Sequence, residues 1–109
     1  SLVGSEMCIR DRSGPAYVFH LIESLAEAGA AEGLAPELAM QLAKATVAGA
    51  GALAEASDED PTQLRINVTS PAGTTAAALE VLMNETDGFP RLLRRAVSAA
   101  AARSRELGT

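Results

Sequence analysis

The segment PELAMQLAKATVAGAGALAEA, residues 36–56, decides the fold class of this 109-residue chain. Its apolar and small residues recur at spacings of three and four, which predicts one continuous helix with a single packing face. That face carries Leu38, Leu42, Ala45, Gly49, Ala52, Leu53 and Ala56. Pro36 suits the first position of a helix, and Glu37 places a negative charge near the positive end of the helix dipole. The helix would be roughly 30 Å long, and the small residues on its face would let another helix approach closely.

A second helix is predicted on the N-terminal side of this segment. Ser13-Gly14-Pro15 supplies a turn and a proline suited to a helix start, and the helix runs to about residue 30. Its apolar residues are Val18, Leu21, Ile22, Leu25, Ala28 and Gly29. Gly29 and Gly33 bracket its end, which separates it from the helix that begins at Pro36.

Three shorter patterns follow on the C-terminal side. Asp60-Pro61-Thr62-Gln63 predicts a capping box, with Asp60 accepting from the Gln63 amide and the Gln63 side chain reaching back, so a short helix should start at Pro61 and end before Pro71. Further helices are expected from Thr74 to the break at Asp87-Gly88, and from Phe89 to Leu107. No segment has the pattern of a strand. The predicted fold is therefore all-α, a bundle of about five helices.

The composition predicts a thin hydrophobic core. Hydrophobic residues make up 48% of the chain, but 23 of them are alanine, and the aromatic residues are Tyr17, Phe19 and Phe89. So few bulky side chains on each helix would leave apolar surface uncovered in a single copy. We therefore expect association with a second copy or with another domain.

Charge and residue content exclude several classes of function. The net charge of −5, without a basic block, argues against nucleic-acid binding. The longest uncharged apolar run, Ala45 to Ala54, is too short to span a membrane. One cysteine, Cys8, and one histidine, His20, make neither an internal disulfide nor a metal site. A reducing, cytoplasmic setting fits this content.

Residues 1–12, SLVGSEMCIRDR, have neither helical nor strand periodicity, and the character of the chain changes abruptly at Ser13. We interpret them as a non-native or disordered N-terminal tail. Residues 13–109 are then the helical domain.

The segment from Asn67 to Thr75, NVTSPAGTT, is the candidate site for chemistry. Hydroxyl side chains, a proline and a glycine directly precede a predicted helix, whose first backbone N–H groups lack intrahelical acceptors. Such a helix start can bind a carboxylate without an arginine. The simpler alternative is an ordinary serine or threonine N-cap. Glu59 belongs to a short acidic run that is usually a solvated approach to a helix.

Several segments together resemble the C-terminal domain of pyrroline-5-carboxylate reductase. They are SGPAY from Ser13, AEAGAAEGL before the second helix, DPTQL from Asp60, VTSPAGTT from Val68, and GFPRLLRRAVSAAAARSREL from Gly88. The resemblance covers Ser13 to about Gly108. It implies helices that interleave with a second copy in a homodimer or larger homo-oligomer. It also implies an N-terminal Rossmann domain, which is absent from this chain.

The resemblance implies a reaction and a set of site residues. Enzymes of this family reduce 1-pyrroline-5-carboxylate to L-proline with NADPH or NADH. The implied substrate-binding residues are Glu59, Ser70, Gly73, Thr74 and Thr75. Among them, the backbone amides around Gly73, Thr74 and Thr75 would receive the carboxylate, and the Thr75 hydroxyl, near the ring nitrogen, would be catalytic. Asn67 is implied beside the nicotinamide of the cofactor.

One position departs from the family pattern, and two other readings stay open. Ala72 stands where the family commonly has glycine. If this position requires a positive φ, the alanine costs about 1 kcal/mol of stability.

Without a dinucleotide-binding domain we expect the chain alone to be inactive. It could instead be a standalone helical dimerisation module, or the helical domain of another two-domain dehydrogenase. The VTSPAGTT loop, and the absence of the lysine expected on the long helix of hydroxyacid dehydrogenases, weigh against the last reading.

Overall fold

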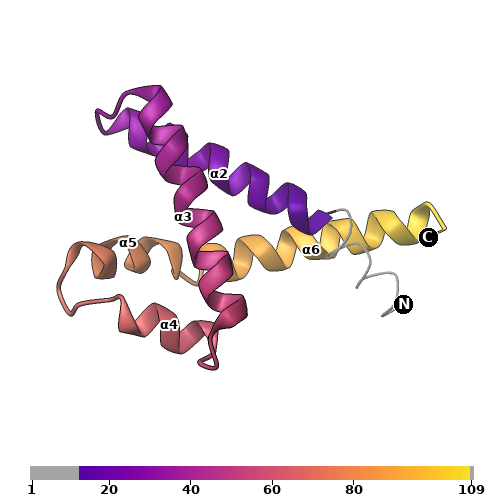
Figure 1. The fold of residues 1–109 in the computed structure, drawn as a ribbon. Helices are drawn as coiled ribbons and strands as arrows, with labels where there is room; N and C mark the ends of the chain where they lie inside the picture. Colours follow the sequence, from indigo (N-terminus) through magenta and orange to yellow (C-terminus); the bar gives the residue numbers. More distant parts are fainter. Residues whose placement is uncertain (1–12, 109) are drawn as a thin grey trace. The chain divides into compact units, whose positions relative to one another are not determined.

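The computed structural model describes residues 13–108, which form helices arranged in two compact units (Figure 1). The helices are α2 (Gly14–Ala31), α3 (Pro36–Ala56), α4 (Pro61–Asn67), α5 (Thr74–Leu82) and α6 (Phe89–Glu106). Residues 13–58, with α2 and α3, form one unit, and residues 59–108 form the other. No strand occurs among these described residues, so the all-α prediction is confirmed. Residues 1–12, interpreted as a tail, lie outside them.

Helix α2 ends in a Schellman motif, which reverses the chain toward α3. The N–H of Leu34 donates to the carbonyl oxygen of Gly29 at 3.1 Å, and the N–H of Gly33 donates to that of Ala30 at 3.0 Å. Gly33 has φ +111°, a conformation that side chains oppose, so glycine is required at this position.

Alanine side chains form the contact between α2 and α3. Ala26 of α2 and Ala39 and Ala43 of α3 are buried, with exposed fractions of 7%, 3% and 5%. Partly buried neighbours surround them: Ile22, Ala30 and Met40. The helices diverge from their connecting turn, so that the far half of α3 runs away from α2 (Figure 1). The predicted thin core is confirmed, because no large hydrophobic side chain of the described residues is fully buried.

The face of α3 that packs differs from the predicted one. Leu38, Leu42 and Leu53, which we call the leucine stripe, are 44%, 48% and 54% exposed. Packing uses the adjacent positions 39 and 43 instead. The reason is steric: helix backbones approach most closely where only methyl side chains meet. The stripe is left uncovered in a single copy.

In the second unit the start of α4 is capped as predicted, but only in part. The N–H of Gln63 donates to Asp60 Oδ1 at 3.0 Å. The Gln63 side chain does not reach back to Asp60; its Nε2 donates forward to Asn67 Oδ1 at 2.8 Å. That half of the predicted capping box is wrong, because the Gln63 amide turns toward its i,i+4 neighbour on the same helix face, and its oxygen does not accept from the Asp60 N–H.

Helix α5 ends at Leu82, earlier than the predicted break, because Asn84 organises a turn before α6. Asn84 Oδ1 accepts from the N–H of Thr86 at 2.8 Å, and the N–H of Gly88 donates to the Asn84 carbonyl oxygen at 2.8 Å. Gly88 is buried in this turn. Across the described residues, no helix has the length and apolar character that crossing a bilayer requires.

Candidate functional site

The loop between α4 and α5 contains a tight β-turn. The N–H of Gly73 donates to the carbonyl oxygen of Ser70 at 3.0 Å, and Pro71 and Ala72 are the two central residues. Ala72 has φ +60°, the only positive φ of a non-glycine residue in the part of the chain that the structure describes. Proline followed by a residue with positive φ is typical of a type II turn, whose second central position is usually glycine. The sequence does not decide whether position 72 requires a positive φ, and the structure shows that it does.

Helix α5 begins directly after this turn without a side-chain cap. Its N-cap residue is Gly73, so the ordinary serine or threonine N-cap considered from the sequence is wrong here. A Cβ at Gly73 would lie 3.2 Å from the Ser70 carbonyl oxygen, a contact that favours glycine. The N–H of Gly73 is used within the turn. The N–H groups of Thr74 and Thr75 belong to the first turn of the helix, where intrahelical acceptors are lacking, and both residues are exposed.

The hydroxyl groups of the loop have different surroundings. Thr69 Oγ1 donates to the carbonyl oxygen of Arg65 at 2.6 Å, which turns this side chain back onto the end of α4. Ser70 and Thr75 are both exposed. Of the hydroxyl side chains in the segment, Thr69 therefore has a structural role, and Ser70, Thr74 and Thr75 lie around the helix start.

Asn67, the last residue of α4, and Glu59, which lies just before the helix start, form a second group. Asn67 Nδ2 donates to Glu59 Oε1 at 3.3 Å and to Oε2 at 3.4 Å. The structure thus brings together a residue predicted on the cofactor side and one predicted on the substrate side. No group of three or more metal-ligating side chains occurs within residues 13–108.

Comparison with known proteins bears on what these groups do. The family model described as "Pyrroline-5-carboxylate reductase dimerisation" matches residues 12–107. The chain belongs to this family. A pyrroline-5-carboxylate reductase from Pisum sativum is 52% identical over 95 residues, and one from Pseudomonas aeruginosa is 43% identical over 95 residues. Each alignment covers 87% of this chain and 34% of the relative, so the chain spans about a third of the relatives' length.

Solved structures agree with the family assignment. A Plasmodium falciparum pyrroline carboxylate reductase with NADP bound superposes with a TM-score of 0.88 at 36% identity, covering 98% of this chain and 40% of that one. A pyrroline-5-carboxylate reductase from Coxiella burnetii gives a TM-score of 0.86 at 40% identity, covering 94% and 37%. These neighbours support the helical fold and the family together.

Gln63 is the residue of this pyrroline-5-carboxylate reductase dimerisation domain that sequence reasoning missed. The sequence pattern indicates only a capping role for Gln63, yet its side chain contacts Asn67, one of the predicted site residues. The signal was available, because residues four apart on a helix are neighbours and Gln–Asn pairs at this spacing commonly bond.

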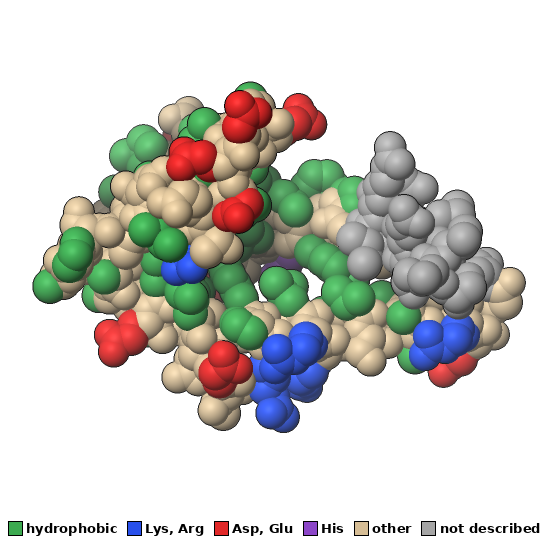
Figure 2. All heavy atoms as spheres, turned by 90° about the horizontal axis from the view of Figure 1, so that it is seen from below, with side chains coloured by type: hydrophobic (Ala, Val, Ile, Leu, Met, Phe, Trp, Pro, Cys, Tyr) green, Lys and Arg blue, Asp and Glu red, His purple; other side chains and the backbone are tan. Residues whose placement is uncertain are grey.

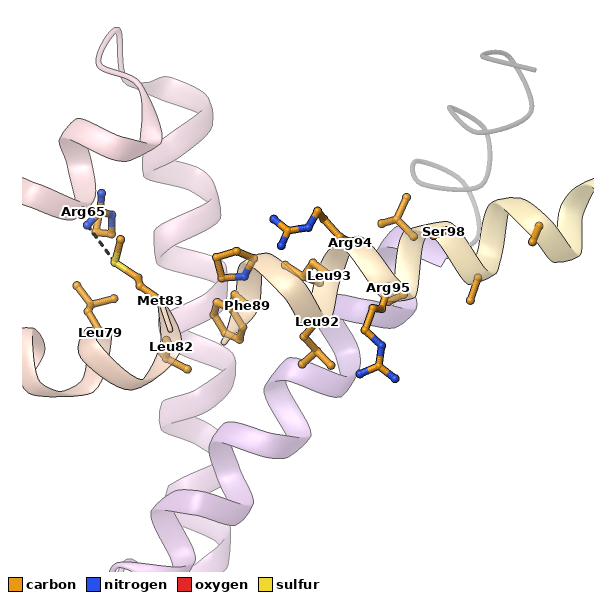
Figure 3. A pocket seen from close by; sticks show the side chains of 15 residues that line it. Arg65, Leu79, Leu82, Met83, Phe89, Leu92, Leu93, Arg94, Arg95 and Ser98 are labelled. Atoms are coloured by element: carbon orange, nitrogen blue, oxygen red, sulfur yellow. Dashed lines mark hydrogen bonds between the residues drawn. The ribbon is translucent and has the colours of Figure 1, made fainter. Parts of the chain in front are cut away.

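The dimerisation domain also exposes apolar surface. Hydrophobic side chains reach the surface at many points of the face seen in Figure 2. In the second unit an open groove is lined by residues of α5, α6 and the segment between them, among them Leu79, Met83, Phe89 and Leu93 (Figure 3). Arg65 of α4 also lines the groove, and its Nη1 donates to Met83 Sδ at 3.3 Å. Exposed apolar surface of this kind is typical of an interaction face.

Proposed function

We propose that this chain is the substrate-binding and dimerisation part of a reductase that converts 1-pyrroline-5-carboxylate to L-proline with NADPH or NADH. The family match supports the reaction class. The observation that carries the role of this chain is the turn before α5, which leaves the Thr74 and Thr75 amides at an exposed helix start.

The helix start suits the carboxylate of the substrate. The unbonded amides at a helix N-terminus and the aligned peptide dipoles together favour a negatively charged group, with about half a positive charge at that end. Because the Gly73 amide already donates to Ser70, the carboxylate is assigned to the Thr74 and Thr75 amides, with Gly73 supplying the close backbone approach. Ser70 holds the turn through its carbonyl oxygen. Glu59, which the family resemblance implies among the substrate-binding residues, lies just before the start of α4, where its carboxylate accepts from Asn67.

The reaction needs a hydride at the imine carbon and a proton at the imine nitrogen. When bound, the reduced nicotinamide supplies the hydride with its electron pair. Thr75 is the proposed catalytic residue of this chain: its hydroxyl would bond the ring nitrogen and orient the C=N bond, with the proton delivered through this hydroxyl or from water.

Residues 13–108 offer few groups that could bind the dinucleotide. Within residues 13–108 there is no strand followed by a glycine-rich turn and a helix, the usual cradle for a dinucleotide. Asn67 is exposed and offers an amide, which fits hydrogen bonding to the carboxamide end of a nicotinamide. The chain would therefore contribute one contact to a cofactor bound elsewhere, and the isolated chain would be inactive.

A homodimer or larger homo-oligomer is part of this proposal. The leucine stripe of α3 and the groove beside α6 expose large hydrophobic side chains, as interaction faces do. A second copy would cover this surface, with helices interleaving between the copies.

The experiment is a reductase assay on the full-length enzyme, defined as the polypeptide that joins this domain to a dinucleotide-binding domain. Wild type should oxidise NADPH only when 1-pyrroline-5-carboxylate is present. Thr75→Val keeps the side-chain shape and removes the hydroxyl, and should lower kcat by about a hundredfold, the usual cost of losing a proton-transfer group. Thr86→Val is the matched control, because Thr86 is exposed in the turn before α6.

The 109-residue chain alone separates this proposal from a dimerisation module without chemistry. Isothermal titration with L-proline should show binding that Thr75→Ala weakens. A dimeric chain that binds no L-proline, together with a full-length enzyme that oxidises no NADPH, would leave only the module.

A further inference from the structure

Glu59, Asn67 and Gln63 form a hydrogen-bonded chain on α4: Glu59 lies just before the helix start, Gln63 in its first turn and Asn67 at its last residue. Gln63 Nε2 donates to Asn67 Oδ1 at 2.8 Å, and Asn67 Nδ2 donates to both carboxylate oxygens of Glu59 at 3.3 and 3.4 Å. All three side chains are exposed, so none is needed to fill a core.

The carboxylate sets the direction of the whole chain. An ionised carboxylate only accepts hydrogen bonds, so the amide nitrogen of Asn67 must face Glu59. The amide oxygen of Asn67 then points toward Gln63, which has to present its own nitrogen. One charge thereby fixes two amide groups that could otherwise rotate between equivalent positions. The amide oxygen of Asn67, which accepts one bond from Gln63, keeps its second lone pair for a ligand.

We propose that Glu59 and Gln63 are positioning residues that hold the Asn67 amide in one orientation, so that it meets the carboxamide of the nicotinamide without reorganising. This rests on the proposed function, since it assigns a task to two residues of the same site. It moves Glu59 from direct substrate contact to the support of Asn67.

A purely structural role is the competing explanation. Gln–Asn pairs at i,i+4 stabilise helices by themselves, and α4 is only 7 residues long. Such a role would change the melting temperature and leave the Michaelis constants alone. A positioning role instead changes the KM for NADPH selectively, because a misoriented amide has to be turned before it binds.

The experiment measures both Michaelis constants and kcat in the full-length enzyme for Glu59→Gln, Gln63→Leu, the double variant and Gln63→Lys. Glu59→Gln keeps the shape of the side chain but replaces a carboxylate, which only accepts hydrogen bonds, by an amide, which also donates them. Glu59→Gln and Gln63→Leu should each raise the KM for NADPH by about fivefold, as expected for one lost hydrogen bond, and leave the KM for the imine unchanged. The double variant should match the singles, because both break the same chain. Gln63→Lys keeps a donor and should stay near wild type.

Gln41→Leu, an exposed glutamine on α3, is the matched control and should change nothing. A higher KM for the imine in Glu59→Gln would return Glu59 to substrate binding and overturn the proposal. An unchanged KM for NADPH would also overturn it, while leaving the reductase activity of wild type, and hence the proposed function, intact.

A second readout does not depend on activity. In the 109-residue chain, the side-chain amide protons of Asn67 should move toward the shifts of a free amide by NMR in both Glu59→Gln and Gln63→Leu. Unmoved resonances would overturn the orienting chain even if the enzyme assay failed.

Discussion

The carbonyl oxygen of Ser70 accepts a hydrogen bond from the N–H of Gly73 at 3.0 Å, across a turn in which Ala72 has φ +60°. The left-handed conformation brings the Cβ of Ala72 close to the following carbonyl oxygen, which costs about 1–2 kcal/mol. The turn therefore holds strain directly before the helix start that is proposed to bind the substrate carboxylate.

Replacing Ala72 by glycine should stabilise the chain. Relief of strain outweighs the entropy that glycine adds to the unfolded chain, for a net gain of about 0.5 kcal/mol, or about 3 °C in the melting temperature. Differential scanning calorimetry measures it. The control is Ala48→Gly, an exposed position within α3, where the same change should cost about 1 kcal/mol.

The same substitution has a kinetic expectation in the full-length enzyme. Ala72→Gly should lower the KM for 1-pyrroline-5-carboxylate or leave it unchanged, because an unstrained turn orients the Thr74 and Thr75 amides at least as well. A clear rise in this KM would contradict the strain account.

Gly88→Ala should be among the most destabilising single-methyl changes in the chain. A Cβ at Gly88 would clash with the Leu82 carbonyl oxygen and lie 2.5 Å from that of Asn84, both of them backbone atoms that cannot rotate away. We expect a loss of about 3 kcal/mol in urea unfolding. Gly51→Ala, where a Cβ meets nothing within 4 Å, should instead stabilise α3 by about 1 kcal/mol. Equal effects of the two changes would mean that the turn before α6 adjusts freely.

Asp60→Ala should weaken α4 by removing the cap at its start. The Gln63 N–H loses its acceptor, and the free energy of unfolding should fall by about 1 kcal/mol. Asp60→Asn keeps an acceptor and should remain close to wild type. Asp58→Ala removes the same charge two residues earlier. A loss as large in Asp58→Ala would assign the effect to charge rather than to capping.

Leu42→Lys should dissociate the homo-oligomer while leaving the α2–α3 contact in place. Leu42 is 48% exposed in a single copy and lies on the leucine stripe, so the lysine is tolerated there until a partner has to cover it. Sedimentation equilibrium should show the dissociation constant rising by at least about tenfold. Gln41→Lys adds the same charge at the neighbouring exposed position. A chain that sediments as a monomer before any substitution would refute the association.

The sequence predicted helix boundaries well because the punctuation is local. Pro36, Pro61 and Gly88 act on their own backbone, so each marks a helix start wherever the rest of the chain lies. The end of α2 near Gly33 is predictable for the same reason. The predicted end of α5 is too late, since the side chain of Asn84 starts the turn before Asp87-Gly88, and neither a glycine nor a proline marks that earlier position.

Packing faces and side-chain partners were harder to predict because they depend on what another element offers. Periodicity placed the leucine stripe on the packing face, whereas α2 meets α3 through Ala39 and Ala43. The predicted direction of the Gln63 side chain is also wrong, since two partners lie within reach along the sequence: the backbone N–H of Asp60 behind it and the side-chain amide of Asn67 ahead of it. The roles of Thr75 and Asn67 in chemistry stay predictions.

The contact built from Ala26, Ala39 and Ala43 makes protein concentration a thermodynamic variable of the fold. Because methyl groups bury little area, we expect each copy alone to have a small free energy of unfolding. Mass action then links folding to assembly. A tenfold dilution lowers the stability of a dimer relative to two unfolded chains by about 1.4 kcal/mol. The melting temperature of this chain is accordingly a property of the solution as much as of the molecule.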